Sequence, residues 1–154
     1  MQIVIAAVGK LGRTAEQALA QTYAERATAN GRSLRLGPVR IIEVEAKKPG
    51  KAAEAEALAP ALADGHVIAC DEHGSEMSSR ELAERLTALR DQGQRRLVFV
   101  IGGPDGLAAS VLRHARERLS FGRQTWPHAL ARLMLAEQVY RATTIMAGQP
   151  YHRD

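Results

Sequence analysis

Residues 97–106 read LVFVIGGPDG, an unbroken apolar run that ends in a glycine-rich turn. A run without polar alternation is typical of a strand buried on both faces of a sheet. Further along the chain in both directions, similar short apolar runs occur at Ile3–Val8, Val39–Val44 and Val67–Cys70, with helical patterns between them. This alternation predicts an α/β fold in which a mostly parallel sheet is covered by helices on both faces.

Several helix boundaries carry local signals. Two capping boxes, in which residues three apart can bond reciprocally, are Thr14 with Gln17 and Ser78 with Glu81. Asn30-Gly31 and Gly93 are expected helix ends. After residue 101, one helical face is expected to carry Leu107, Val111, Leu112, Ala115 and Leu119, followed by a short strand at Leu119–Phe121.

The last expected helix is the best marked. Pro127 suits its first turn, and Gly148 with Pro150 suits its end. Adjacent faces of this helix carry a broad set of side chains: Leu130, Leu133, Met134, Glu137, Tyr140 and Arg141. This surface makes the helix a candidate for both core and dimer packing.

Length and composition predict a single soluble domain over residues 1–154. The chain is 45% hydrophobic and 25% charged, which is ordinary for a globular protein. No apolar run approaches the roughly 18 residues that cross a bilayer, and the start of the chain does not resemble a signal peptide. The single cysteine, Cys70, excludes an internal disulfide and a cysteine-based zinc site. These features predict a cytoplasmic protein.

The net charge of +4 and the pI of about 9.6 suit a polyanionic partner such as RNA. Aromatic residues make up only 4% of the chain, so RNA would be recognised through phosphates and shape more than by base stacking. The basic loop Lys47–Lys51 has two interpretations. It is either an ordinary solvated turn or a phosphate contact.

Two glycine-bearing loops are candidate ligand sites. Gly102–Gly106 alone reads as a tight turn, and Ser120–Pro127 alone reads as the start of a helix. Together they favour a binding site, because both should follow neighbouring strands at the edge of the sheet where ligands bind. The strand end at Cys70 should lie there too, with its thiol acting as a small hydrophobe. The five histidines form no pair at metal-ligand spacing, and no GxSxG elbow is present.

The last residues before Asp154 are Tyr151, His152 and Arg153, polar groups that a partner subunit or a ligand would have to order. With GGPDG, LSFGRQTWPH and LAEQVYRA, this PYHR tail resembles the RlmH family of SPOUT methyltransferases. The resemblance implies a homodimeric α/β-knot enzyme with a C-terminal trefoil knot. It also implies that S-adenosyl-L-methionine is used to methylate N3 of a pseudouridine in helix 69 of large-subunit rRNA, in the assembled ribosome.

The resemblance also implies residue roles. The cofactor would contact Cys70, Gly103, Gly122, Arg123, Gln124, Thr125, Trp126 and Pro127. The catalytic tail would be Tyr151, His152 and Arg153, with Arg153 stabilising charge on the base and His152 acting as base or hydrogen-bond partner; no metal is expected. Two alternatives remain: a non-catalytic ribosome-associated RNA-binding protein of the same fold, and an unrelated α/β nucleotide-binding protein.

Overall fold

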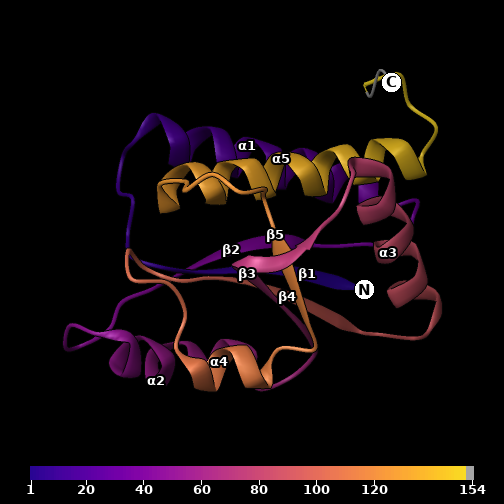
Figure 1. The fold of residues 1–154 in the computed structure, drawn as a ribbon. Coiled ribbons are helices and arrows are strands. Elements are labelled where there is room, and N and C mark those ends of the chain that lie inside the picture. Colours follow the sequence, from indigo (N-terminus) through magenta and orange to yellow (C-terminus); the bar gives the residue numbers. More distant parts are fainter. Residues whose placement is uncertain (152–154) are drawn as a thin grey trace.

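A computed structural model describes residues 1–151, which form one five-stranded sheet with helices on both sides (Figure 1). The strands are β1 (Gln2–Val8), β2 (Val39–Val44), β3 (His66–Glu76), β4 (Arg96–Ile101) and β5 (Glu117–Ser120). Their order is β2-β1-β4-β3-β5, and every pairing is parallel. The predicted α/β class is confirmed, as are strands at the four apolar runs. The strand end expected at Cys70 is wrong, because β3 continues to Glu76 and pairs again with β5 at residues 75–76.

The helices form one layer on each face of the sheet. Helices α1 (Ala15–Gly31), α3 (Ser79–Asp91) and α5 (His128–Met146) cover one face, and α2 (Lys51–Leu62) and α4 (Ala109–His114) cover the other (Figure 1). Alternate residues of the central strands point to opposite faces. Ile5 and Phe99 therefore lie in one core, and Val4 and Val98 lie in the other. Burial on both faces explains why β1 and β4 are apolar without interruption.

The predicted helix signals are found at α3 and α1. Ser78 Oγ accepts a hydrogen bond from the Glu81 N–H, and the Glu81 carboxylate accepts one from the Ser78 N–H, which completes the capping box. At α1, Thr14 Oγ1 accepts from the Gln17 N–H at 3.2 Å, which is one half of the expected box. Helix α1 ends at Gly31, as predicted.

The prediction that one helix extends from residue 107 to Leu119 is wrong. Helix α4 stops at His114 because Ala115 adopts extended backbone angles. The N–H of the next residue, Arg116, donates to the Val67 carbonyl at 2.9 Å, which brings the chain alongside β3. Leu119 therefore lies in β5, where it pairs with β3.

Helix α5 buries a different face from the one that the sequence highlighted. Its fully buried apolar residues are Leu135, Ala136, Val139 and Ala142. Leu133, Met134 and Tyr140 are only partly buried, and Leu130 is exposed. The side of α5 that carries the residues singled out from the sequence is thus not its main core face. None of the helices within residues 1–151 is long and apolar enough to cross a bilayer, and the trefoil knot stays a prediction.

Candidate functional site

A cavity of about 670 Å³ lies at the carboxyl ends of β4 and β5 and beside the middle of β3. Its walls come from residues 70–72 of β3, the loop after β4, the loop after β5 and the first turn of α5. Ligands of open parallel sheets bind at this edge. The volume also falls within the range of roughly 300–1,000 Å³ that is usual for small-molecule and cofactor pockets.

The structure brings most of the predicted cofactor residues to this cavity. They are Cys70, Gly103, Gly122, Gln124, Thr125, Trp126 and Pro127. Arg123 belongs to the same loop but is exposed and does not line the cavity. The two glycine loops were expected to follow neighbouring strands, which is wrong, because β3 lies between β4 and β5. That order places the middle of β3, where Cys70 pairs with the last residue of β4, between the loops. Cofactor contact by these residues stays a prediction.

The loop after β4 is a tight turn that also presents bare backbone. The Gly106 N–H donates to the Gly103 carbonyl at 3.0 Å, which closes the turn. A Cβ on Gly102 would lie 2.7 Å from the Gly106 carbonyl carbon, so this position excludes any side chain. A Cβ on Gly103 would lie 2.7 Å from Oε1 of Glu54, which reaches the loop from α2. The turn and the ligand interpretations of this motif are therefore compatible.

The loop after β5 is held by its own hydrogen bonds. Ser120 Oγ accepts from the Gly122 N–H at 3.1 Å, and Gly122 has a positive φ of 97°. Trp126 Nε1 donates to the Phe121 carbonyl at 3.3 Å, which ties the far side of the loop to its beginning. Pro127 then forms the N-cap of α5. The loop is thus a folded flap over one side of the cavity.

The charges lining the cavity are acidic. Asp71, Glu72 and Asp105 line it, whereas its described lining contains no lysine or arginine. Asp71 Oδ2 is buried without a hydrogen-bond partner and lies 3.5 Å from Nη1 of Arg118. A negative lining and bare backbone at the glycines of the two loops suit a cationic ligand of moderate size. S-adenosylmethionine, which carries a sulfonium cation, fits these features.

The environment of the Cys70 thiol disfavours its reactive, ionised form. Burial raises its pKa to about 12, so the reactive thiolate is scarce at neutral pH. This agrees with the prediction that Cys70 acts as a small hydrophobe. Across residues 1–151, no group of three or more His, Cys, Asp or Glu side chains is placed to hold a metal ion.

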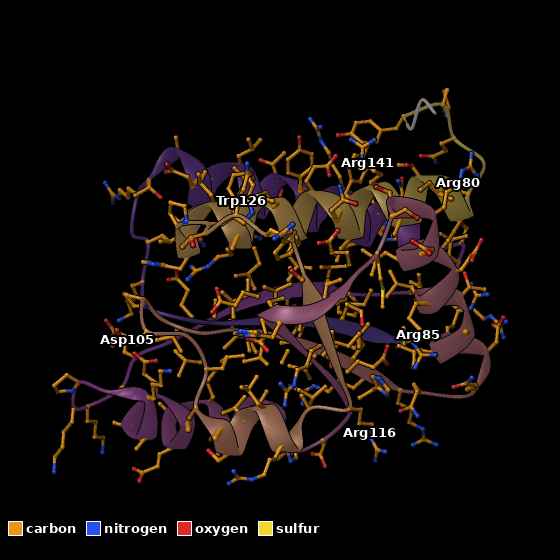
Figure 2. The ribbon with its side chains drawn as sticks, viewed as in Figure 1. Arg80, Arg85, Asp105, Arg116, Trp126 and Arg141 are labelled. Carbon is orange, nitrogen blue, oxygen red and sulfur yellow. The ribbon has the colours of Figure 1, made fainter. Side chains whose placement is uncertain are left out.

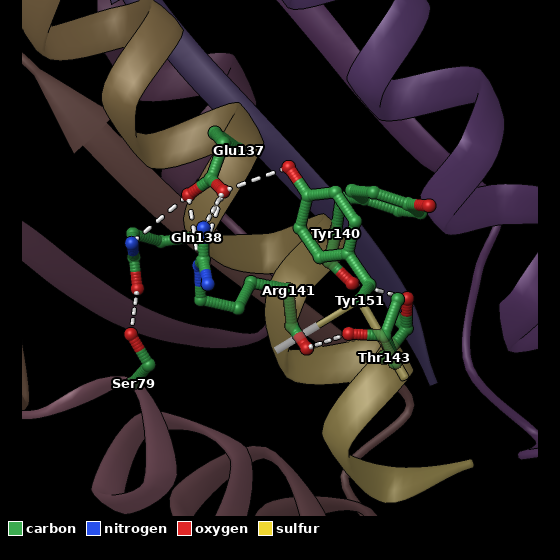
Figure 3. Close-up of polar contacts among 8 residues, drawn as sticks. Ser79, Glu137, Gln138, Tyr140, Arg141, Thr143 and Tyr151 are labelled. Carbon is green, nitrogen blue, oxygen red and sulfur yellow. Dashed lines mark hydrogen bonds and ion pairs between the residues drawn. The ribbon is translucent and has the colours of Figure 1, made fainter. Parts of the chain in front are cut away.

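A second cavity of about 550 Å³ adjoins the first and shares Leu119, Ser120, Phe121 and Gly122 with it. Glu137 of α5 lines this second cavity and binds several groups at once (Figure 3). Its Oε1 accepts from Arg141 Nη2 at 2.6 Å and from the Tyr151 hydroxyl at 3.1 Å. Gln138 donates to Glu137 Oε2 at 2.9 Å. We call Glu137, Arg141 and Tyr151, together with Tyr140, the tail cluster.

Aromatic contacts complete the tail cluster. The Tyr151 ring meets the Tyr140 ring edge-on at a centroid distance of 4.7 Å, and Arg141 Cζ lies 5.0 Å from the Tyr151 centroid. Burial raises the pKa of Tyr151, and the Tyr23 hydroxyl and Glu137 carboxylate raise it further. Tyr151 therefore stays protonated and donates to Glu137. His152 and Arg153 lie outside the described residues, so their catalytic roles stay predictions.

Arg132 is a buried cation that the sequence analysis missed. It has no exposed surface, and its Nη1 pairs with Glu43 Oε1 at 2.5 Å. Its Nη2 donates to the Gly9 carbonyl at 2.9 Å, which fixes the first turns of α5 against the ends of β1 and β2. Ala131 beside it lines the first cavity. Arg132 stands in the apolar first half of α5, and nothing in its sequence neighbourhood signalled this role.

The sequence matches the model of a protein family described as "Predicted SPOUT methyltransferase" over residues 1–152. It is 66% identical to the "Ribosomal RNA large subunit methyltransferase H" of Caulobacter sp. (strain K31), with the whole of both chains covered. It is 49% identical to the protein of that name from Ruegeria sp. (strain TM1040), with 99% of each chain covered.

Solved structures share the fold. A probable methylase family protein from Haemophilus influenzae Rd KW20 superposes with a TM-score of 0.61 at 14% identity, covering 99% of this chain and 70% of that one. The tRNA (m1G37) methyltransferase from Aquifex aeolicus superposes with a TM-score of 0.52 at 13% identity, covering 100% of this chain and 76% of that one. At these identities the likeness concerns the fold alone.

Proposed function

Because the chain belongs to the SPOUT methyltransferase family, we propose that it methylates N3 of a pseudouridine in helix 69 of large-subunit rRNA. S-adenosylmethionine is the proposed methyl donor, and the assembled ribosome is the proposed substrate, which places the protein in the cytoplasm. Support for the rRNA substrate comes from full-length relatives named as large-subunit rRNA methyltransferases. The observation that carries the proposal is the acidic cavity, partly lined by glycine backbone, at the carboxyl ends of β4 and β5 and beside the middle of β3.

The cofactor would be held by the two glycine loops and the middle of β3. Backbone groups of Gly103 and of the loop 122–127 would contact it, and Cys70 would form an apolar wall. When bound, the cofactor supplies an activated methyl group together with its leaving group. The protein has to align the two reactants and exclude water. Alignment alone can lower a barrier by about 7–11 kcal/mol.

The tail supplies the remaining chemistry in this proposal. Arg153 stabilises negative charge that develops on the base as the N3 proton leaves, and His152 acts as base or hydrogen-bond partner. Tyr151 does not take the proton, because its raised pKa keeps its own hydroxyl protonated. Its hydrogen bond to Glu137 instead holds Tyr151 itself against α5.

We further propose that the active form is a homodimer in which the tail completes a site shared between subunits. Large apolar side chains remain exposed near the two cavities, among them Leu19, Trp126 and Leu130. Leu133 and Met134 of α5, which are only partly buried, add to this apolar surface. A monomer by light scattering at working concentration, with full activity, would contradict this assembly.

The test is methyl transfer from labelled S-adenosylmethionine to ribosomes that lack the modification, with mass spectrometry to locate the label. Label on N3 of the helix 69 pseudouridine is expected. A variant lacking residues 151–154 should lose transfer while its cofactor affinity stays within a few-fold of the full chain. Cofactor binding without any transfer by the full chain would instead indicate a non-catalytic RNA-binding protein.

A further inference from the structure

The four lysines of the chain lie in two segments. Lys10 follows β1, while Lys47, Lys48 and Lys51 lie between the end of β2 and the first residue of α2. Because β1 and β2 run parallel to the other strands, both loops lie at the carboxyl edge of the sheet. The loop before α2 projects from the same end of the molecule as the loop after β4 (Figure 1). We call this set the lysine rim.

The lysine rim is connected to the cavity through α2. Lys51 is the first residue of α2, and Glu54, one turn later, reaches Gly103 in the wall of the cavity. Asp105 of that wall lies at the opposite end of the molecule from Arg116, which precedes β5 (Figure 2). The rim and the cavity therefore share one edge of the molecule.

The rim lysines are available for a ligand. Lys47, Lys48 and Lys51 are exposed, and among the described residues they form no ion pair. Lys10 differs, because its Nζ pairs with Glu45 Oε2 at 2.5 Å. Many arginines, by contrast, are engaged in the fold: Arg85 with Glu117, Arg132 with Glu43 and Arg141 with Glu137. The exposed positive charge at this edge thus comes from these three neighbouring lysines, with Arg13 in the loop after β1 and Arg123 in the loop after β5; the lysines form its densest group.

The lysine rim and the cavity have opposite charge. The phosphates and the target base of an RNA substrate are therefore directed to different places. The cavity lining is acidic and repels phosphates, whereas a lysine ammonium is a point charge that binds them. We propose that Lys47, Lys48 and Lys51 bind backbone phosphates beside the target nucleotide and so leave only the base to enter the cavity. This assignment rests on the proposed function and adds to it the surface that holds the RNA.

The test compares two triple variants with the same loss of charge. Lys47→Ala/Lys48→Ala/Lys51→Ala removes the rim charges, and Arg32→Ala/Arg95→Ala/Arg116→Ala removes three exposed charges before β2, β4 and β5, at the opposite edge. Binding to a labelled helix 69 stem-loop is measured over a salt series, along with KM for the ribosomal substrate and Kd for S-adenosylmethionine. Thermal melting verifies that both variants fold.

The rim variant should weaken RNA binding roughly ten- to hundredfold and reduce the slope of log K against log salt by about 3, about 1 per lysine. Its cofactor Kd should not change, and the control variant should stay within about twofold of wild type. Equal losses in both variants, or no loss in the rim variant, would overturn the assignment. Failure of the proposed function would show differently, as no methyl transfer by the wild-type protein.

Discussion

The Tyr151→Phe substitution tests whether the tail cluster positions the catalytic tail. It removes the hydroxyl that donates to Glu137 Oε1 at 3.1 Å and keeps the ring that contacts Tyr140 and Arg141. If transfer requires the tail to begin at this anchor, weaker anchoring lowers the fraction of molecules that are ready to react. The rate of methyl transfer should then fall, while binding of the cofactor in the first cavity should not.

The size of the effect follows from the contacts that are lost. A hydrogen bond to a charged group contributes about 1.5–3 kcal/mol, and we take the lower end because Tyr151 is 37% exposed. About 1.5 kcal/mol corresponds to a roughly tenfold slower rate. Tyr151→Ala also removes an aromatic pair of about 0.5–1.5 kcal/mol and a cation–π contact of about 0.5–1 kcal/mol. Its rate should fall roughly 10²- to 10³-fold.

The assay is single-turnover methyl transfer to unmodified ribosomes with saturating cofactor, together with calorimetric titration of S-adenosylmethionine. Tyr140→Phe is the matched control, because it keeps the ring that contacts Tyr151 and leaves the Tyr151–Glu137 hydrogen bond in place. A Tyr151→Phe protein with a wild-type rate would refute the reasoning. A loss of cofactor affinity as large as the loss in rate would do the same.

Three further predictions concern the cavity and the framework around it. Gly103→Val should weaken cofactor binding at least roughly tenfold in calorimetry with little change in melting temperature, since the atom it meets belongs to a flexible side chain. Arg132→Ala leaves the Glu43 carboxylate without its buried partner and should lower the free energy of unfolding in urea by about 3–5 kcal/mol; a loss below about 1 kcal/mol would contradict this role. Burial raises the pKa of Glu117, but hydrogen bonds, chiefly from Arg85, lower it by more, so the folded pKa lies below the unfolded one. The stabilising effect of the Glu117 carboxylate is therefore present above the unfolded pKa of about 4.3 and is lost as the pH falls through the lower folded pKa. Melting temperatures of Glu117→Gln should accordingly depend less on pH below about 4.3 than those of wild type, and parallel curves would argue against this ion pair.

The sequence and the structure agree best where the signal is local. The unbroken run at residues 97–101 and the capping box of Ser78 and Glu81 depend on residues near one another in the chain, and both appear as expected. The predicted end of helix α4 was wrong because the observed end depends on a hydrogen bond from the Arg116 N–H to the carbonyl of Val67, which is distant in sequence. Helix α2 gave no such start signal, since Gly50 at its N-cap has no side chain to bond.

The sequence by itself determined the strands, most helix boundaries, the glycine loops and the family, because these depend on short-range periodicity or on motifs of a few residues. Only the tertiary structure decided that β3 lies between β4 and β5, which places Cys70 between the loops. It also decided that buried Arg132 forms an ion pair with Glu43 and that the Tyr151 hydroxyl donates a hydrogen bond to Glu137. The physical reason is that apolar strands of similar composition can pair in several orders. The order that forms is set by the packing of the whole chain, and partners far apart in sequence meet only after that choice.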